Sequence, residues 1–398
     1  MKVLFICYAV GSEKNDKERL VNPSGNKYQL NLIECLNDKL SRNLDIISIP
    51  GNPYFPLSSH FYIPGAVVSI VPGVLARSIG FINLPVLKNL LQSVAVFMYT
   101  FKWLVVNRRE AQRIILTFNS NVNTVLPSIL LRLFCRVKII SYVTDPPYFL
   151  EKSKNTYDVL KRIYLDISKV LMRNVDGMVV ISKHIVDVFK ITAPYLVVDN
   201  GYSENVYADI DVMVKDKTIK NKIVMFAGSL SVHNGIVELV EAFNLLSAEN
   251  IELWIYGEAE LKDYVIDSAQ RNPKIKYMGV LGSKKILEVY SCADLLINTR
   301  NPYREVSDCT FPSKMTEYLV SGTPVLTTRL KCYGPEYDEL FYFIDDFTSN
   351  GISQKILEIL MLPAEEICLR KKTVIKFMLD NKTWSRQIDK VIDFLAIV

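Results

Sequence analysis

The stretch Ile223–Leu246, IVMFAGSLSVHNGIVELVEAFNLL, reads as a strand, a loop and a helix in succession. It opens on a short apolar run, which predicts a buried β-strand. The loop that follows contains Gly228 and Gly235, and apolar residues then recur every three or four positions from 236 to 246, as on one face of an amphipathic helix. A strand, a glycine-bearing loop and a helix form one unit of a parallel α/β sheet.

The same alternation extends through the chain on both sides of this stretch. The β-rich runs are 3–7, 44–49, 113–117, 137–143, 177–181 and 196–198, then 251–256, 275–277, 295–298 and 324–327. A polar stretch, 209–222, separates the two series. The sequence therefore predicts an α/β protein with two doubly wound parallel-sheet (Rossmann-like) domains, 1–203 and 204–380, that face a cleft.

Positive charge is concentrated in the first of these domains. The chain has 398 residues and a formal charge of +5, but residues 46–144 hold nine bases and one acid, or +8, which leaves −3 elsewhere. Nucleic acid is not expected as a partner, because the band lacks a recognised binding motif and is rich in apolar residues. The apolar positions 94, 97, 98, 101, 104 and 105 predict either a surface helix that docks on an anionic membrane or an ordinary buried helix.

The sequence argues against a membrane-spanning helix, an export signal and a metal site. The uncharged run 89–101 has 13 residues, short of the roughly 20 that span a bilayer. The apolar start, 3–7, is too short for a signal sequence and predicts a first strand. Seven scattered cysteines without a C-x-x-C pair, with three histidines, predict a reduced cytosolic protein that binds no metal.

Two junctions between a strand and a helix carry candidate chemistry. In the first, Gly228 permits a close backbone approach, and Asn234 is a suitable N-cap for a helix whose free N–H groups could bind phosphate. In the second, the segment 310–325, TFPSKMTEYLVSGTPV, predicts a two-turn helix between an N-cap at Ser313 and a C′ residue at Gly322. A plain βα turn remains the alternative for the first junction.

Lys314 and Glu317 are the charged residues of that short helix. Lys314 lies in the first turn, where the helix dipole disfavours a cation, so a nearby anion such as a diphosphate would explain it. Glu317 lies one turn later and could accept hydrogen bonds from sugar hydroxyls. The alternatives are a solvated surface lysine and a surface carboxylate. Asp145 after the strand 137–143, and Gly25 and Asn26 in a loop before a helix over 28–40, are weaker candidates.

The pattern resembles the family-4 retaining glycosyltransferases of the GT-B fold, in particular their bacterial polysaccharide-assembly branch. The main match is the motif F-P-S-K-x-x-E-Y at 311–318, followed by Gly322, Pro324 and Val325. Further elements similar to the family are 227–230 with Gly235, 199–201, 181–183, 290–296 and Trp384. The resemblance implies a C-terminal helix, 381–398, that crosses back to the first domain.

The resemblance also implies roles for individual residues. Glu317 would bind the donor ribose, Lys314, Ser313 and Thr310 would lie near the diphosphate or the sugar, and Gly25 and Asn26 would form the first domain's loop. The chain departs from the family at Ser229 and Asn234, where the family carries Arg and Lys. It also has Thr144 before Asp145, at a position where the family often carries a histidine. Cys309 replaces a family glutamate, and Glu305 or Asp308 could supply that carboxylate.

The resemblance implies sugar transfer from a nucleotide-diphosphate donor, with anomeric retention and no cofactor or metal. The acceptor would be a saccharide or a polyprenyl-linked saccharide in surface polysaccharide biosynthesis. Asp145 and Glu305 are the expected catalytic residues. We expect a cytoplasmic protein, with peripheral attachment to the inner face of the membrane as an alternative to a freely soluble one. The alternatives are a catalytically silent homologue that binds nucleotide-sugar or membrane, and a nucleotide-sugar 2-epimerase.

Overall fold

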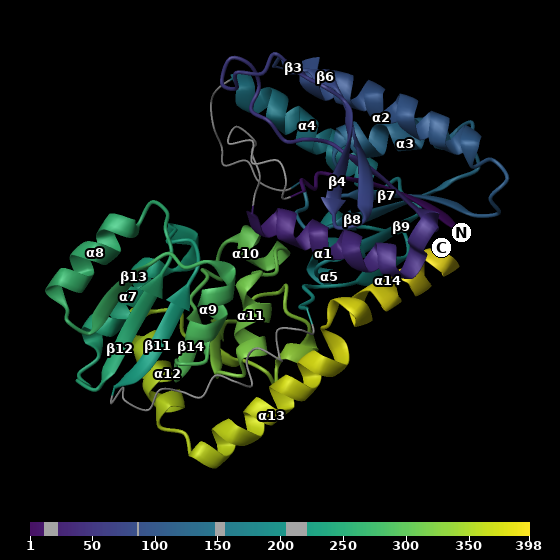
Figure 1. The fold of residues 1–398 in the computed structure, drawn as a ribbon. Coiled ribbons are helices and arrows are strands. Elements are labelled where there is room, and N and C mark those ends of the chain that lie inside the picture. Colours follow the sequence, from purple (N-terminus) through teal and green to yellow (C-terminus); the bar gives the residue numbers. More distant parts are fainter. Residues whose placement is uncertain (12–22, 86, 148–155, 204–220) are drawn as a thin grey trace. The chain divides into compact units, whose positions relative to one another are not determined.

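The chain forms two compact units. The computed structural model describes residues 1–11, 23–85, 87–147, 156–203 and 221–398. Unit 1 comprises Met1–Asp199 and Trp384–Val398, and unit 2 comprises Asn200–Thr383. Both are layered α/β structures, with a mostly parallel sheet covered by helices (Figure 1).

Unit 1 contains an eight-stranded sheet in the order β10-β9-β8-β7-β1-β2-β5-β4 and a separate two-stranded pair, β3 and β6. Its strands are β1 (Lys2–Cys7), β2 (Leu44–Ser48), β3 (Tyr62–Ile63), β4 (Ala66–Val71), β5 (Val74–Ser78), β6 (Phe81–Ile82), β7 (Arg113–Phe118), β8 (Lys138–Val143), β9 (Gly177–Val180) and β10 (Tyr195–Val197). Its helices are α1 (Pro23–Leu40), η1 (Ser41–Asn43), α2 (Leu87–Val106), α3 (Val122–Arg132), α4 (Thr156–Met172), α5 (Lys183–Phe189) and α14 (Trp384–Ile397).

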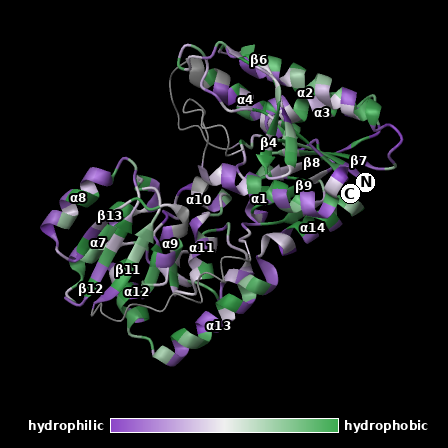
Figure 2. Ribbon diagram, in the orientation of Figure 1, coloured by the Kyte–Doolittle hydropathy of each residue, from purple (hydrophilic) through white to green (hydrophobic). Residues whose placement is uncertain are grey.

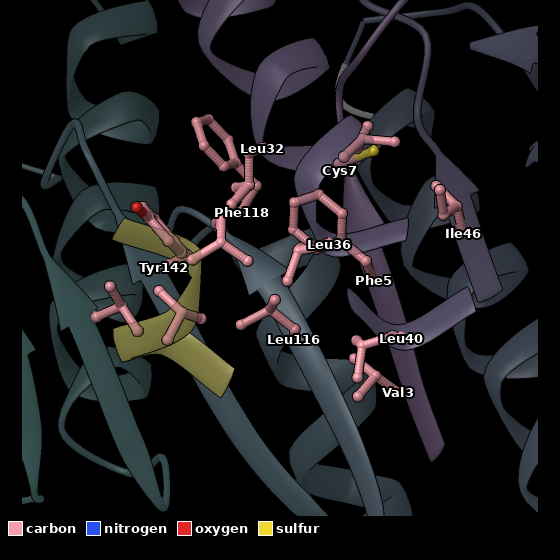
Figure 3. Close-up of a cluster of buried hydrophobic side chains, with 14 of the residues drawn as sticks. Val3, Phe5, Cys7, Leu32, Leu36, Leu40, Ile46, Leu116, Phe118 and Tyr142 are labelled. Carbon is pink, nitrogen blue, oxygen red and sulfur yellow. The ribbon is translucent and has the colours of Figure 1, made fainter. Parts of the chain in front are cut away.

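The alternation of side chains along β1 explains why helices cover both faces of this sheet. Successive strand residues point to opposite faces, and here both sets are apolar. Val3, Phe5 and Cys7 pack with residues of α1 and α14, in the cluster drawn in Figure 3. Leu4 and Ile6 pack on the other face with residues of α2 and α3. The predicted first strand is therefore confirmed as a central strand that is buried on both sides.

One edge of the sheet departs from the expected parallel arrangement. β5 pairs with β2 in parallel, but β4 pairs with β5 antiparallel. The two strands are joined by a tight turn in which Gly73 has φ 77°. The sequence predicts no strand in this region. The apolar alternation was masked there by five prolines between residues 50 and 72, which are tolerated because they precede or follow the paired positions.

Unit 2 contains a six-stranded parallel sheet in the order β13-β12-β11-β14-β15-β16. Its strands are β11 (Lys222–Ala227), β12 (Ile251–Tyr256), β13 (Ile275–Gly279), β14 (Leu295–Asn298), β15 (Val325–Thr328) and β16 (Tyr342–Ile344). Its helices are η2 (Val232–Asn234), α7 (Ile236–Leu245), α8 (Lys262–Arg271), α9 (Ser283–Tyr290), α10 (Glu305–Cys309), α11 (Lys314–Ser321), η3 (Pro335–Tyr337), α12 (Ser349–Leu360) and α13 (Ala364–Asn381). The predicted strand–loop–helix unit is confirmed as β11 and α7.

Candidate functional site

The strand order of unit 2 reverses between β11 and β14. From β11 the chain proceeds to β12 and β13 on one side, then crosses to β14 on the other side of β11. In parallel α/β sheets, ligands bind beyond the carboxyl ends of the strands at such a reversal. The loops that follow β11 and β14 are therefore the first place to look for a site.

These two loops are held together by hydrogen bonds. Thr299 Oγ1 donates to the carbonyl oxygen of Asn234 at 2.9 Å, and the backbone N–H of Asn301 donates to the carbonyl oxygen of His233 at 2.9 Å. Gly235 has φ 66°, and a Cβ at this position would lie 1.9 Å from the carbonyl oxygen of Thr299. Only glycine allows the loops to approach this closely.

The role predicted for Asn234 as a helix N-cap is wrong. Asn234 ends the short helix η2, and Gly235 takes the N-cap position of α7. The Asn234 side chain is buried and donates to the carbonyl oxygen of Ser229 at 2.7 Å and to Ser231 Oγ at 3.1 Å. It therefore shapes the loop, while the Ser229 side chain is exposed to solvent.

Lys314 is the first residue of α11, and its ammonium group is buried. The Nζ lies 3.7 Å from the centroid of the Phe226 ring and makes no hydrogen bond with any residue that the structure describes. A Cβ on Gly228, which has φ 150°, would lie 3.2 Å from this Nζ. Burial, followed by the charge of Arg300, holds the pKa of Lys314 well below its usual value. The alternative of a solvated surface lysine is therefore wrong.

Arg300 supplies a second cation that the sequence analysis missed. It follows β14 by two residues, is almost fully buried, and donates from Nη2 to Thr310 Oγ1 at 2.6 Å. The available signal was an arginine two residues after the strand-like run 295–298. Thr310 lies just before α11, so Arg300 links the end of β14 to the segment that leads into the Lys314 helix.

His233 lies in the electrostatic field of these two cations. Its Nδ1 lies 2.9 Å from Ser231 Oγ. Burial lowers the pKa of His233, and the charges of Arg300, Arg304 and Lys314 lower it further, against an opposing effect of Glu260. The cations Arg300 and Lys314 thus create a field that disfavours a further positive charge and favours an anion.

Ser313 and Glu317 flank Lys314 on α11. Ser313 stands at the N-cap position, but it has helical φ and ψ of −55° and −31° and its side chain makes no capping bond, so the predicted capping role is wrong. Glu317 lies in the first turn and is half-buried. The helix is fixed to the sheet by Tyr318 Oη, which accepts a hydrogen bond from the Ala227 backbone N–H at 2.9 Å. The predicted C′ position of Gly322 is confirmed, with φ 69°.

Of the two candidates for a carboxylate near Cys309, Asp308 and Glu305, the structure describes the side chain of Asp308. Asp308 is nearly buried and forms an ion pair with Lys331, at 2.9 Å from Oδ2 to Nζ, so its charge already has a partner. Cys309 is a buried free thiol. Glu305 begins α10, and its side chain lies outside the described residues.

In unit 1 the structure places Asp145 in an exposed loop directly after β8. Asn119, at the end of β7, fixes the backbone of this loop. Its Oδ1 accepts hydrogen bonds from the backbone N–H of Thr144 at 2.9 Å and of Asp145 at 3.1 Å. Asn119 has φ 58°, a left-handed conformation that asparagine tolerates better than most residues. The sequence did not indicate Asn119, which holds the loop of the candidate residue Asp145.

Gly25 and Asn26 do not lie in a loop, as the sequence predicted, because α1 begins at Pro23. Asn26 Oδ1 accepts a hydrogen bond from the Val10 N–H at 2.9 Å, and its Nδ2 donates to the Val10 carbonyl oxygen at 3.0 Å. The Gly25 carbonyl oxygen accepts from Gln29 Nε2 at 3.2 Å. Proline at the first helical position, with its N–H missing, favours this earlier start. Asn26 therefore fixes the segment that follows β1.

Replacing Asn119 by alanine tests how the Asp145 loop is held. The variant leaves two backbone N–H groups without their acceptor, so we expect it to lower the free energy of unfolding by about 2 kcal/mol. Lys190 is the matched control, because it also has positive φ (52°) but is exposed at the end of α5. Urea denaturation of Asn119→Ala and Lys190→Ala measures the difference. Equal losses in the two variants would show that only backbone strain was changed.

Comparisons with known proteins agree with this architecture. Residues 221–361 match the family model described as Glycosyl transferases group 1. No curated protein matches the chain significantly. Similar solved structures include a sucrose-phosphate synthase from Thermosynechococcus elongatus, with 13% identity, a TM-score of 0.65 and 99% coverage of both chains.

Two further structures are similar over nearly the whole chain. A glycosyltransferase from Rickettsia africae has 12% identity and a TM-score of 0.67, with 99% of this chain and 97% of that chain covered. HepE of Anabaena, solved in complex with UDP and glucose, has 14% identity and a TM-score of 0.64, with both chains fully covered. At these identities the likeness shows the fold. The chain therefore has the two-domain GT-B fold, and residues 221–361 of its C-terminal unit are similar to group 1 glycosyltransferases.

Proposed function

We propose that the protein transfers a sugar from a nucleotide-diphosphate donor, bound by unit 2, to an acceptor bound by unit 1. The observation that carries this proposal is the buried Lys314 ammonium, which has no hydrogen-bond partner among the described residues and lies in the field of Arg300. A buried charge without a partner lowers the stability of the folded state by roughly several kcal/mol. Such a charge is therefore expected where a ligand supplies the missing counter-charge. A diphosphate beyond the ends of β11 and β14 fits this requirement.

The same two cations explain how the bond to the donor sugar would break. Cleavage of that bond leaves negative charge on the departing diphosphate, and fixed cations stabilise this charge as it develops. Arg300 and Lys314 thereby take the place of the Arg and Lys that the resembled family carries at positions 229 and 234. In this scheme the leaving phosphate accepts the acceptor's proton, as the resemblance implies, and the anomeric configuration is retained.

The remaining site residues have proposed positions around the donor and the acceptor. Glu317 binds the ribose, and Ser313 and Thr310 lie near the sugar or the diphosphate. On the acceptor side, Asp145 is the proposed catalytic carboxylate, with Asn119 as its positioning residue. We propose a saccharide or polyprenyl-linked saccharide acceptor, as in surface polysaccharide assembly, in agreement with the basic, apolar character of residues 46–144.

A panel of nucleotide-sugars tests the proposal in two steps. Binding is measured by the shift in melting temperature, since a donor at 100 times its Kd stabilises the folded state by about 2.7 kcal/mol. Transfer is then measured with labelled donor and membrane lipid extracts as a source of acceptors. Binding and transfer are both expected. Binding without transfer or donor hydrolysis would instead identify a silent nucleotide-sugar-binding homologue, and the absence of binding would contradict the proposal.

Replacing Glu317 by glutamine tests the ribose contact. Loss of one charge-assisted hydrogen bond is expected to weaken donor binding about tenfold, with little change in stability. The control is Glu365→Gln, which changes another glutamate in the first turn of a helix, α13, in the same unit. Isothermal titration with the donor, or with its nucleotide diphosphate, gives both affinities. If both variants bind like the unchanged protein, Glu317 does not contact the ribose.

A further inference from the structure

α2 presents a line of apolar side chains to solvent. We name these residues the α2 stripe: Leu90, Val94, Met98, Phe101 and Val105. They are spaced three or four positions apart, so they share one face of the helix. Apolar positions recur along α2 in Figure 2. Single exposed apolar residues are normal on a protein surface, but a contiguous line along a helix of 20 residues marks an interaction surface.

The opposite face of α2 is fixed inside unit 1. Val96 and Leu104 belong to the core between α2 and the sheet. Trp103 Nε1 donates a hydrogen bond to Asp45 Oδ2 at 2.8 Å. Gln92 Oε1 accepts one from Asn123 Nδ2 at 3.0 Å. By length and composition α2 could cross a membrane, unlike the shorter helix expected from the sequence. Crossing would break these contacts, so the helix is a surface element of its unit.

Bases lie on α2 and directly after its end, while acids are nearly absent from this part of the sequence. Lys102, Arg108 and Arg109 are exposed and form no ion pair with any described residue. Residues 46–144 contain one acid, Glu110. The segment after α3, a helix that packs beside α2, exposes two further apolar side chains, Leu133 and Phe134. A second copy of this surface would repel the first, because both would carry the same positive charge.

We propose that the α2 stripe and these three bases bind the protein to an anionic lipid bilayer, with α2 lying in the plane of the interface. The apolar side chains enter the boundary between headgroups and acyl chains, and the bases contact anionic headgroups. This inference deepens the proposed function, because it names the surface through which the protein binds the membrane that contains a lipid-linked acceptor. It rests on that function only for the identity of the acceptor.

Flotation with lipid vesicles tests the surface directly. We expect the full chain to float with vesicles of phosphatidylcholine and phosphatidylglycerol. It should float about tenfold less with phosphatidylcholine alone or at 0.5 M salt, because the attraction between bases and anionic headgroups is then absent or screened. Lys102→Ala/Arg108→Ala/Arg109→Ala is expected to weaken binding about 100-fold. Met98→Glu/Phe101→Glu is expected to weaken it by about the same factor or more, because it removes apolar contact and adds repulsion.

Leu369→Glu is the matched control, because Leu369 on α13 is 67% exposed and Met98 is 64% exposed. This variant is expected to bind vesicles like the unchanged protein. Equal binding to neutral and anionic vesicles, or full binding by Met98→Glu/Phe101→Glu, would overturn the proposal. So would a dimer that this double variant abolishes, or resistance to extraction from vesicles by alkaline carbonate. Donor binding, followed separately by thermal shift, distinguishes failure of this surface from failure of the proposed function.

Discussion

Replacing Lys314 by methionine is expected to lower kcat/KM for sugar transfer by about 10²–10³-fold and to raise the stability of the free protein. The activity falls because one of two fixed cations no longer stabilises the charge that develops on the leaving diphosphate, and single groups of this kind are worth roughly 3–4 kcal/mol. The Arg300 guanidinium, held by Thr310 at 2.6 Å, remains in place and accounts for residual activity.

The stability of the free protein rises because the substitution removes a buried charge that lacks a hydrogen-bond partner among the described residues. Its Nζ is buried over the Phe226 ring at 3.7 Å without a hydrogen bond to any described residue. Methionine has a similar shape and no charge, so we expect the free energy of unfolding at pH 7 to increase by about 1–2 kcal/mol. Denaturation without donor measures this change, and kinetics with donor measure the loss of transfer.

The pH dependence gives an independent check on the burial of this charge. Because burial lowers the pKa of Lys314 in the folded state, the unfolded state binds more protons between that lowered pKa and about 10.5. The stability of the unchanged protein should therefore rise with pH in this window, relative to Lys314→Met. Below the folded-state pKa the difference between the two proteins is at its largest and constant.

Lys262→Met is the control, because Lys262 is an exposed lysine of the same unit that pairs with Glu258 at 2.8 Å. It should leave activity unchanged and keep the rise in stability with pH below about 10.5, because the pair with Glu258 raises the pKa of Lys262 and so acts above that range. The proposed role of Lys314 would be contradicted if Lys314→Met retained full transfer activity. A loss of activity accompanied by lower stability would instead mean that the lysine supports the fold.

Replacing Gly235 by alanine is expected to lower the free energy of unfolding by about 3–5 kcal/mol, among the largest effects of a single substitution. Two costs combine here. The φ of 66° is unfavourable for any residue with a Cβ, and the Cβ would lie 1.9 Å from the carbonyl oxygen of Thr299. Since the clash is with backbone, the loops after β11 and β14 must separate, and donor binding should weaken as well.

Two other glycines of unit 2 separate these costs. Gly279 has φ 76°, and a Cβ there would have no atom within 4 Å, so Gly279→Ala should lower the free energy of unfolding by only about 1 kcal/mol. Gly282 is equally open and has an ordinary φ of −69°, so Gly282→Ala should stay within about 0.5 kcal/mol. Chemical denaturation of the three variants gives the series. A Gly235→Ala variant no worse than Gly279→Ala would show that the two loops can part freely.

The strands and helices that local patterns encode were predictable from the sequence. The run at 3–7 and the unit 223–246 are confirmed as β1 and as β11 with α7, because burial on both faces and helical periodicity leave local signatures. The end of α11 at Gly322 was likewise predictable, since a left-handed C-terminal residue favours glycine. Its start at Lys314 was predictable as well, although Ser313 adopts a helical conformation and its side chain makes no capping hydrogen bond.

By itself the sequence determined the two-domain α/β fold and the positions of its candidate junctions, because these follow from periodicity and turn chemistry within short segments. Only the tertiary structure decided that Lys314 is buried and that Arg300 shares its field, because the adjacency of β11 and β14 brings together residues distant in the chain. It also decided which face of α2 remains open to solvent. Burial and charge pairing are sums over non-local neighbours, and no local pattern contains them.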